Sequence, residues 1–216
     1  QMADLCEKVG ADVHDVSRGI GLDKRIGSKF LHPGPGYGGS CFPKDTQALV
    51  KTANYYNSNI SIVENVINYN SQRKIDMAEK IISALGKNYE NKKISILGLA
   101  FKPETDDMRE SPCLDIIPKL QEKNLQICAY DPVAMDEAKK LLENIQFADS
   151  IDDCIKNSDA LVILTEWNEF RSLSPERLKQ HMKGNILIDL RNALNPDSFL
   201  ESGFNLIQVG RPTPSQ

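Results

Sequence analysis

The most reactive feature of the sequence is a cysteine between a glycine-rich segment and the predicted start of a helix. Cys41 follows the glycine-rich residues 34–39 and lies two positions before Pro43. Proline is tolerated in the first turn of a helix because the N–H groups there have no intrahelical partner. A helix N-terminus and Lys44 would both favour thiolate over thiol, and the thiolate is the nucleophile. Asp45 could position a water or transfer a proton, so this segment could carry out covalent catalysis.

These residues alone leave a second interpretation open. Most free cysteines are small buried hydrophobes, and Cys41 could be one of them. The glycines favour the catalytic interpretation, since they allow a ligand to approach the backbone closely. The other four cysteines lie on apolar faces or in predicted strands and are expected in the core: Cys6, Cys113, Cys128 and Cys154.

A second candidate site lies in residues 98–112, between a predicted strand and a predicted helix. Loops at the carboxyl ends of parallel strands are where open α/β sheets bind nucleotides. Lys102 and Arg109 could hold phosphates there. The segment lacks the G-x-G-x-x-G pattern, so it is not a dinucleotide fingerprint. A structural turn with surface charges is the alternative.

Three further groups of residues have weaker claims. Asp131 ends a predicted strand, as a ribose-binding acid would, but without the glycine fingerprint a turn with Pro132 is favoured. Arg191 also follows a strand and could be either a ligand contact or a surface arginine. The histidines are scattered and predict no metal site: His14, His32 and His181.

The elements that must position these residues fall into two parts. Residues 1–88 are predicted to be helical, and the last of their helices begins with a capping box formed by Ser61 and Glu64. Residues 89–216 alternate short apolar runs with helical stretches, which is typical of a doubly wound, mostly parallel sheet. The predicted strands are 94–99, 125–130, 161–165, 186–190 and 206–209. The fold class is therefore α/β, with a helical segment followed by a Rossmann-like sheet.

Composition limits the class of protein and its partners. The 216 residues are 40% hydrophobic and 26% charged, which is enough apolar content for a buried core. The net charge of −4 argues against nucleic acid or an anionic membrane as the partner. No apolar run approaches the roughly 20 residues that cross a bilayer. Five widely spaced cysteines make a disulfide framework improbable and predict a cytoplasmic location.

Taken together, four motifs resemble those of the UDP-glucose 6-dehydrogenases in order and spacing, and the resemblance spans essentially the whole chain. They are residues 25–27, 33–45, 98–112 and 189–192. The resemblance implies oxidation of C6 of the sugar of UDP-glucose with two NAD⁺. An aldehyde forms first, the cysteine adds to give a thiohemiacetal, and a second oxidation leaves a thioester that water hydrolyses to UDP-glucuronate.

The resemblance also implies roles for individual residues. Cys41 would be the nucleophile and Asp45 would assist the water, while Lys44 and Arg109 would meet NAD. Arg25 would reach the sugar site of a neighbouring subunit, which implies a homo-oligomer such as a homodimer. The remaining UDP-sugar contacts would be Phe30, Leu31, His32, Gly34, Gly36, Tyr37, Gly38, Phe101, Lys102 and Arg191.

Family members have an N-terminal NAD-binding domain with the glycine fingerprint, and their catalytic lysine and asparagine would lie just upstream of Gln1. We therefore expect this chain to be the C-terminal half, with half an active site. The alternative is a non-catalytic module for nucleotide-sugar binding and oligomerisation. Relatives that oxidise UDP-N-acetylhexosamines typically carry His before the cysteine, and those that oxidise GDP-mannose carry Leu after it. Ser40 and Phe42 favour UDP-glucose.

Overall fold

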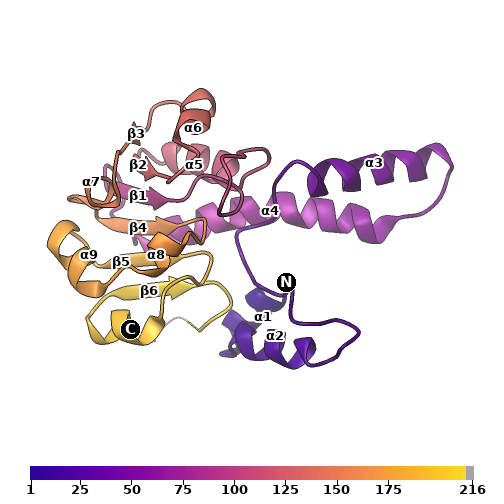
Figure 1. Ribbon diagram of the computed structural model, residues 1–216, viewed down its shortest axis with the longest axis horizontal. Coiled ribbons are helices and arrows are strands. Elements are labelled where there is room, and N and C mark those ends of the chain that lie inside the picture. The colour runs from indigo at the N-terminus through magenta and orange to yellow at the C-terminus, as the bar shows by residue number, and fades with distance from the viewer. Residues whose placement is uncertain (213–216) are drawn as a thin grey trace.

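The computed structural model describes residues 1–212 and begins with four helices. The two longest, α3 and α4, lie side by side as a hairpin that projects away from the sheet (Figure 1). The first half of α4 lies in this hairpin, and its buried residues all lie in the second half, which packs on α5. The helix α4 therefore joins the helical part of the chain to the sheet. The bounds are α1 (Met2–Val9), α2 (Val13–Gly21), α3 (Phe42–Tyr55) and α4 (Ser61–Ala84).

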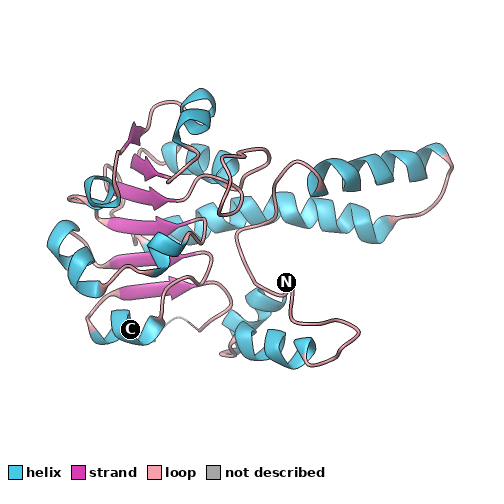
Figure 2. Cartoon of the chain, in the orientation of Figure 1, coloured by secondary structure: helices cyan, strands magenta, loops and turns pink. Residues whose placement is uncertain are grey.

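The second part of the described chain is a parallel sheet with six strands in the order β3-β2-β1-β4-β5-β6 (Figure 2). This order confirms the predicted doubly wound α/β fold, and it places the topological switch point between β1 and β4. The strands are β1 (Lys93–Leu97), β2 (Gln126–Tyr130), β3 (Gln146–Phe147), β4 (Ala160–Ile163), β5 (Ile186–Asp189) and β6 (Asn205–Gln208). The helices are α5 (Cys113–Gln121), α6 (Met135–Leu141), α7 (Ile151–Ile155), α8 (Asn168–Arg171), α9 (Pro175–His181) and α10 (Pro196–Glu201).

Apolar side chains cover both faces of the sheet. One cluster contains Ile81 of α4 and Ile116 of α5, and the other contains Phe170 and Phe199. Strands buried on both faces read as continuous apolar runs, which is why the sequence predicts them. No helix in the described residues is both long enough and apolar enough to cross a bilayer.

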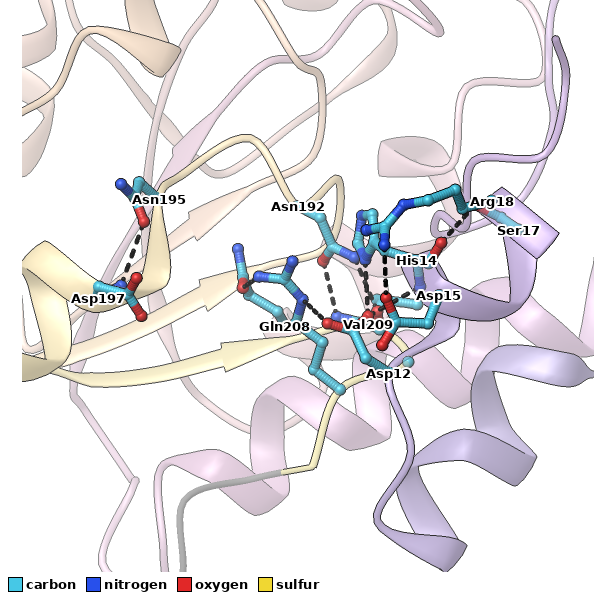
Figure 3. A network of polar contacts seen from close by, with 12 residues as sticks. Asp12, His14, Asp15, Ser17, Arg18, Asn192, Asn195, Asp197, Gln208 and Val209 are labelled. Carbon is cyan, nitrogen blue, oxygen red and sulfur yellow. Dashed lines mark hydrogen bonds and ion pairs between the residues drawn. The ribbon is translucent and has the colours of Figure 1, made fainter. Parts of the chain in front are cut away.

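The helices α1 and α2 are fastened to the carboxyl end of β6. The N–H of Val13 donates to the Gly210 carbonyl at 2.9 Å, and the N–H of Gly210 donates to Glu7 at 2.7 Å. Asp12 caps α2 by accepting from the His14 N–H at 2.8 Å, and it pairs with Arg211 at 3.1 Å. Figure 3 shows this start of α2 beside Asn192, Gln208 and Val209.

Two ion pairs fasten α1 to α4. Asp4 accepts hydrogen bonds from Tyr69 and from the buried Arg73. Glu7 pairs with Lys80 at 2.6 Å. The helix α1 is therefore attached both to the long helix α4 and, through Glu7, to the end of β6.

Two expectations about local structure differ from the fold. The prediction of a capping box was wrong, because Ile60 occupies the N-cap position and Ser61 is the first helical residue. The side chain of Asn59 supplies the acceptor instead, since its Oδ1 accepts from the Ser61 N–H at 2.9 Å. The short elements β3, α8 and α10 were not predicted, because runs of two to six residues show no resolvable period.

Candidate active site

Cys41 occupies the N-cap position of α3, and Pro43 lies in the first turn. Its thiol is exposed, so it is not a core cysteine, whereas the other four cysteines are buried as expected. The Ser40 hydroxyl lies 3.6 Å from the Cys41 sulfur. The free N–H groups of a helix N-terminus favour negative charge, so this position suits a thiolate.

Charged and aromatic residues flank Cys41 in the sequence and in the loop after β1. The rings of Tyr37 and Phe42 pack edge to face with centroids 4.8 Å apart. Lys44 pairs with Asp45 at 3.3 Å, and both side chains are largely exposed. A hydrogen bond to Asp107 raises the pKa of the Arg109 guanidinium, and negative charge on Cys41 adds to this effect. Arg109 lies in the loop whose backbone binds Gly39, two residues before Cys41.

The glycine-rich loop before Cys41 packs directly on the loop after β1. The N–H of Gly39 donates to the Arg109 carbonyl at 2.7 Å. A Cβ on Gly38 would meet the Glu110 carbonyl oxygen at 2.3 Å, and one on Gly39 would lie 2.7 Å from the Phe101 ring. Both positions require glycine because the second loop occupies the space that a side chain needs.

Arg191 joins the same assembly from the end of β5. Its Nε donates to the Leu164 carbonyl at 2.8 Å and its Nη2 to the Phe101 carbonyl at 3.1 Å. Its guanidinium also lies against Gly34, where a Cβ would be 3.1 Å from Nη1. Burial lowers the pKa of Arg191, while Glu166 at 3.2 Å opposes that effect. Three motifs that are distant in the sequence thus meet at the carboxyl edge of the sheet.

Asp131 has a structural place beside this site. One carboxylate oxygen accepts from the N–H groups of residues 99–100 at 2.7 and 3.0 Å and from Trp167 at 3.2 Å. The other accepts from the N–H groups of residues 133–134. The favoured interpretation as a turn residue is confirmed, and the buried carboxylate anchors the loop after β1.

Most of the other predicted site residues lie on the exposed surface. The Lys102 ammonium lies 5.4 Å from the Phe101 ring centroid. Arg25 pairs with Asp23 at 2.7 Å, and its side chain is 89% exposed. Phe30 has a left-handed backbone with φ of 63° and is 98% exposed. Leu31 is half-buried and His32 is exposed. The structure brings none of these four N-terminal residues into the described contacts with Arg191 or residues 98–112.

One face of α4 forms part of the assembly and was not predicted. The Asn70 amide exchanges two hydrogen bonds with the backbone of Tyr37, at 2.8 and 3.1 Å. The Arg73 Nε donates to the Gly34 carbonyl at 3.1 Å, and Lys74 packs beneath the same loop. The sequence does contain a signal for this face. Arg73 and Lys74 lie three and four positions after Asn70, on the same side of the helix as the apolar residues that α4 buries.

Comparison with known proteins gives the same family for both parts of the chain. Residues 1–72 match the profile of the UDP-glucose/GDP-mannose dehydrogenase family, central domain, and residues 95–196 match that family's UDP binding domain. The UDP-glucose 6-dehydrogenase of Rhizobium meliloti (strain 1021) is 52% identical over 212 residues, covering 98% of this chain and 48% of the relative. The chain thus spans about half the length of the curated relatives it matches.

Solved structures agree with this assignment. A UDP-glucose dehydrogenase from Pyrobaculum islandicum is 28% identical with a TM-score of 0.76, covering 95% of this chain and 44% of that one. An NDP-N-acetyl-D-galactosaminuronic acid dehydrogenase from Methanosarcina mazei Go1 is 26% identical with a TM-score of 0.87, covering 99% of this chain and 47% of that one. The two family models and the similar sequences show that the chain belongs to the UDP-glucose/GDP-mannose dehydrogenase family.

Proposed function

We propose that this chain is the C-terminal half of an enzyme that oxidises UDP-glucose to UDP-glucuronate with two NAD⁺. The observation that carries the proposal is the exposed Cys41 at a helix N-terminus, directly after a loop that packs on the carboxyl edge of the sheet. Nucleotides bind at this edge of open α/β sheets. The identity to the Rhizobium meliloti UDP-glucose 6-dehydrogenase supports the choice of reaction.

The chemistry of this chain centres on the Cys41 sulfur. The thiolate adds to the C6 aldehyde carbon and forms a C–S bond, and the carbonyl oxygen takes up a proton. Loss of hydride and of that proton converts the thiohemiacetal to a thioester. Water, oriented by Asp45, then attacks the thioester carbon, the C–S bond breaks and the thiolate leaves with its electron pair. A thiolate suits both steps because it is a strong nucleophile and a good leaving group.

NAD⁺ accepts a hydride in each of the two oxidations when it is bound. The side chains of Lys44 and Arg109 are 75% and 69% exposed, and each already has one carboxylate partner. Two exposed cations near Cys41 fit the diphosphate of a dinucleotide. We propose that they hold that part of NAD⁺ beside the nucleophile.

The UDP-sugar is proposed to lie along the junction of the two loops. Gly34, Gly36, Tyr37 and Gly38 belong to the loop before Cys41, and Phe101, Lys102 and Arg191 belong to the sheet side of the junction. Lys102 provides an exposed charge for phosphate. Since the Arg191 guanidinium already bonds the carbonyls of Leu164 and Phe101, its part is to hold residues 101 and 164 together beside the ligand.

A second subunit is proposed to complete the sugar site. Arg25 and Phe30 are exposed and, with Leu31 and His32, precede the catalytic loop, so they are available to a neighbouring molecule. We propose a homo-oligomer in which residues 1–88 form the central, dimerising domain and residues 89–216 bind the nucleotide. The five free cysteines favour a cytoplasmic location.

The experiment that tests this function uses the full-length protein with a panel of substrates. UDP-glucose, GDP-mannose and UDP-N-acetylhexosamines are each incubated with NAD⁺, and NADH and uronate are quantified. We expect two NADH per UDP-glucuronate, with UDP-glucose preferred. Preference for an N-acetylated sugar would favour the activity named for the Methanosarcina mazei structure. No NADH from any of them would favour a non-catalytic binding module.

A further inference from the structure

Three side chains on one face of α4 contact the backbone of the loop that leads to Cys41. Asn70, Arg73 and Lys74 are spaced i, i+3 and i+4, which aligns them on a helix surface. All three meet residues 34–37. A rigid helix therefore supports the loop from below, while the loop after β1 covers it from the other side.

Asn70 makes the most specific of these contacts. Its Oδ1 accepts from the Tyr37 N–H at 2.8 Å, and its Nδ2 donates to the Tyr37 carbonyl at 3.1 Å. Gly36 has φ of 129°, and a Cβ there would lie 3.0 Å from the same Oδ1. The loop thus crosses directly over the Asn70 amide, which fixes both the N–H and the carbonyl of Tyr37.

The restraint on Tyr37 extends to the cysteine. The Tyr37 ring packs edge to face on Phe42, which is the residue after Cys41. On the other flank, the Gly39 N–H is held by the Arg109 carbonyl. Cys41 itself is exposed, so its position is set by these neighbours rather than by burial.

The two cations beside Asn70 fix the helix face. Arg73 is 6% exposed and pairs with Asp4, and Lys74 is 5% exposed and pairs with Asp115 at 2.7 Å. These pairs connect α4 to α1 and α5. The part of α4 that contacts the loop is therefore held in place by both neighbouring helices.

We propose that Asn70 is a positioning residue for the Cys41 nucleophile, acting through the backbone of Tyr37. The proposal rests on the function proposed above. Its consequence is specific: the first oxidation, from alcohol to aldehyde, does not need the sulfur, whereas capture of the aldehyde and the second oxidation do. Displacement of a reacting group by about 1 Å can cost a hundredfold in rate.

The first test measures how firmly the Asn70–Tyr37 hydrogen bonds, which we call the tether, hold the loop, and it requires no catalysis. Hydrogen exchange of residues 35–42 is compared in the wild-type chain, Asn70→Ala, Asn70→Asp and the control Gln72→Ala. Gln72 is exposed on the same helix, and its side chain bonds only Asp76 among residues 1–212, at 2.9 Å. We expect exchange at least about tenfold faster in Asn70→Ala and unchanged in Gln72→Ala. Asn70→Asp keeps the acceptor for the Tyr37 N–H and should be intermediate. Wild-type exchange in Asn70→Ala would overturn the tether.

The second test separates positioning from general stability in the full-length enzyme. A hydrazine in the assay intercepts aldehyde that Cys41 fails to capture. For Asn70→Ala we expect hydrazone to appear, NADH per UDP-glucuronate to rise above two, and kcat for UDP-glucuronate to fall about 10- to 100-fold. Asn70→Asp should recover part of kcat, and Gln72→Ala should keep the ratio at two.

The outcomes of the second test distinguish the two proposals. Loss of thermal stability in Asn70→Ala with the ratio still at two and kcat unchanged would overturn the positioning role. A wild-type enzyme that forms no UDP-glucuronate would overturn the proposed function instead, and the hydrogen-exchange comparison would still decide whether Asn70 fixes the loop.

Discussion

The backbone N–H of Gly39 donates to the carbonyl of Arg109 at 2.7 Å, which fastens the loop before Cys41 to the loop after β1. These loops belong to the helical and sheet parts of the chain, respectively. The contact therefore brings the proposed nucleophile to the edge of the sheet where nucleotides bind. The position of Cys41 depends on how closely the two backbones approach.

Gly38 tests that close approach. Gly38→Ala would place a Cβ 2.3 Å from the Glu110 carbonyl oxygen, and a backbone atom cannot move aside cheaply. We expect the free energy of unfolding to fall by about 1–3 kcal/mol, measured by urea denaturation. The control is Gly19→Ala, in α2 with open space around its Cβ position, which should be neutral or mildly stabilising. Equal stability of the two variants would contradict the packing described here.

Acid should weaken the attachment of α1 to α4. Burial raises the pKa of the Asp4 carboxyl, but the hydrogen bond from Tyr69 and the charge of Arg73 outweigh it, so the pKa lies below its ordinary value. A lowered pKa stabilises the fold above the unfolded pKa of about 3.9, and that stability is lost as pH falls through the folded pKa.

The variant Asp4→Asn isolates this contribution. At neutral pH it should be less stable than wild type, because Arg73 is buried and loses its partner. The difference between the two proteins should shrink as pH falls below about 4. Urea denaturation between pH 3 and 7 measures it, with Asp136→Asn, at a side chain that is 94% exposed, as the control. A constant difference across that range would rule out the linkage to Asp4.

The 216-residue chain alone should bind UDP weakly and should not reduce NAD⁺. Lys102 provides exposed charge for phosphate, while the chain contains no dinucleotide fingerprint. Calorimetry measures the binding of UDP, and absorbance at the NADH band measures the reduction of NAD⁺. Lys102→Ala should weaken the binding of UDP. NADH formation by this chain would show that these 216 residues contain a complete cofactor site.

The sequence predicts the elements that show a regular pattern of apolar residues. The apolar runs of β1 and β4 predict a parallel sheet because strands buried on both faces have no polar side. The proposed role of Cys41 is suggested by the glycines and the proline within a few residues of it in the sequence. The contacts of Asn70 could not be predicted in this way, since nothing local indicates which loop an asparagine on a helix will meet. The prediction of a capping box was wrong because the side chain of Asn59, rather than that of Glu64, accepts from the Ser61 N–H.

Arg25 tests the shared sugar site. Its only described ion pair is with Asp23, and its side chain is exposed, so Arg25→Ala should leave the fold intact. An arginine that donates charge-assisted hydrogen bonds to a ligand contributes enough that KM for UDP-glucose should rise about tenfold or more. Steady-state kinetics of the full-length enzyme measure this change.

Subunit mixing then locates the Arg25 side chain. A mixed dimer of Arg25→Ala and Cys41→Ser subunits keeps one site with its own Cys41 and its neighbour's Arg25, whereas either homodimer keeps none. Activity at low substrate should therefore recover on mixing. No recovery, once subunit exchange has been demonstrated, would place Arg25 in its own subunit's pocket or away from the site.

The central claim is that Cys41 forms and releases the thioester, and UDP-glucuronate production by Cys41→Ser in the full-length enzyme tests it most directly. A serine ester leaves far less readily than a thioester, so the account predicts that UDP-glucuronate formation is abolished. The control Cys6→Ser changes a buried cysteine of α1 and should retain activity in proportion to its folded fraction. UDP-glucuronate formed by Cys41→Ser at the wild-type rate would contradict covalent catalysis at this residue.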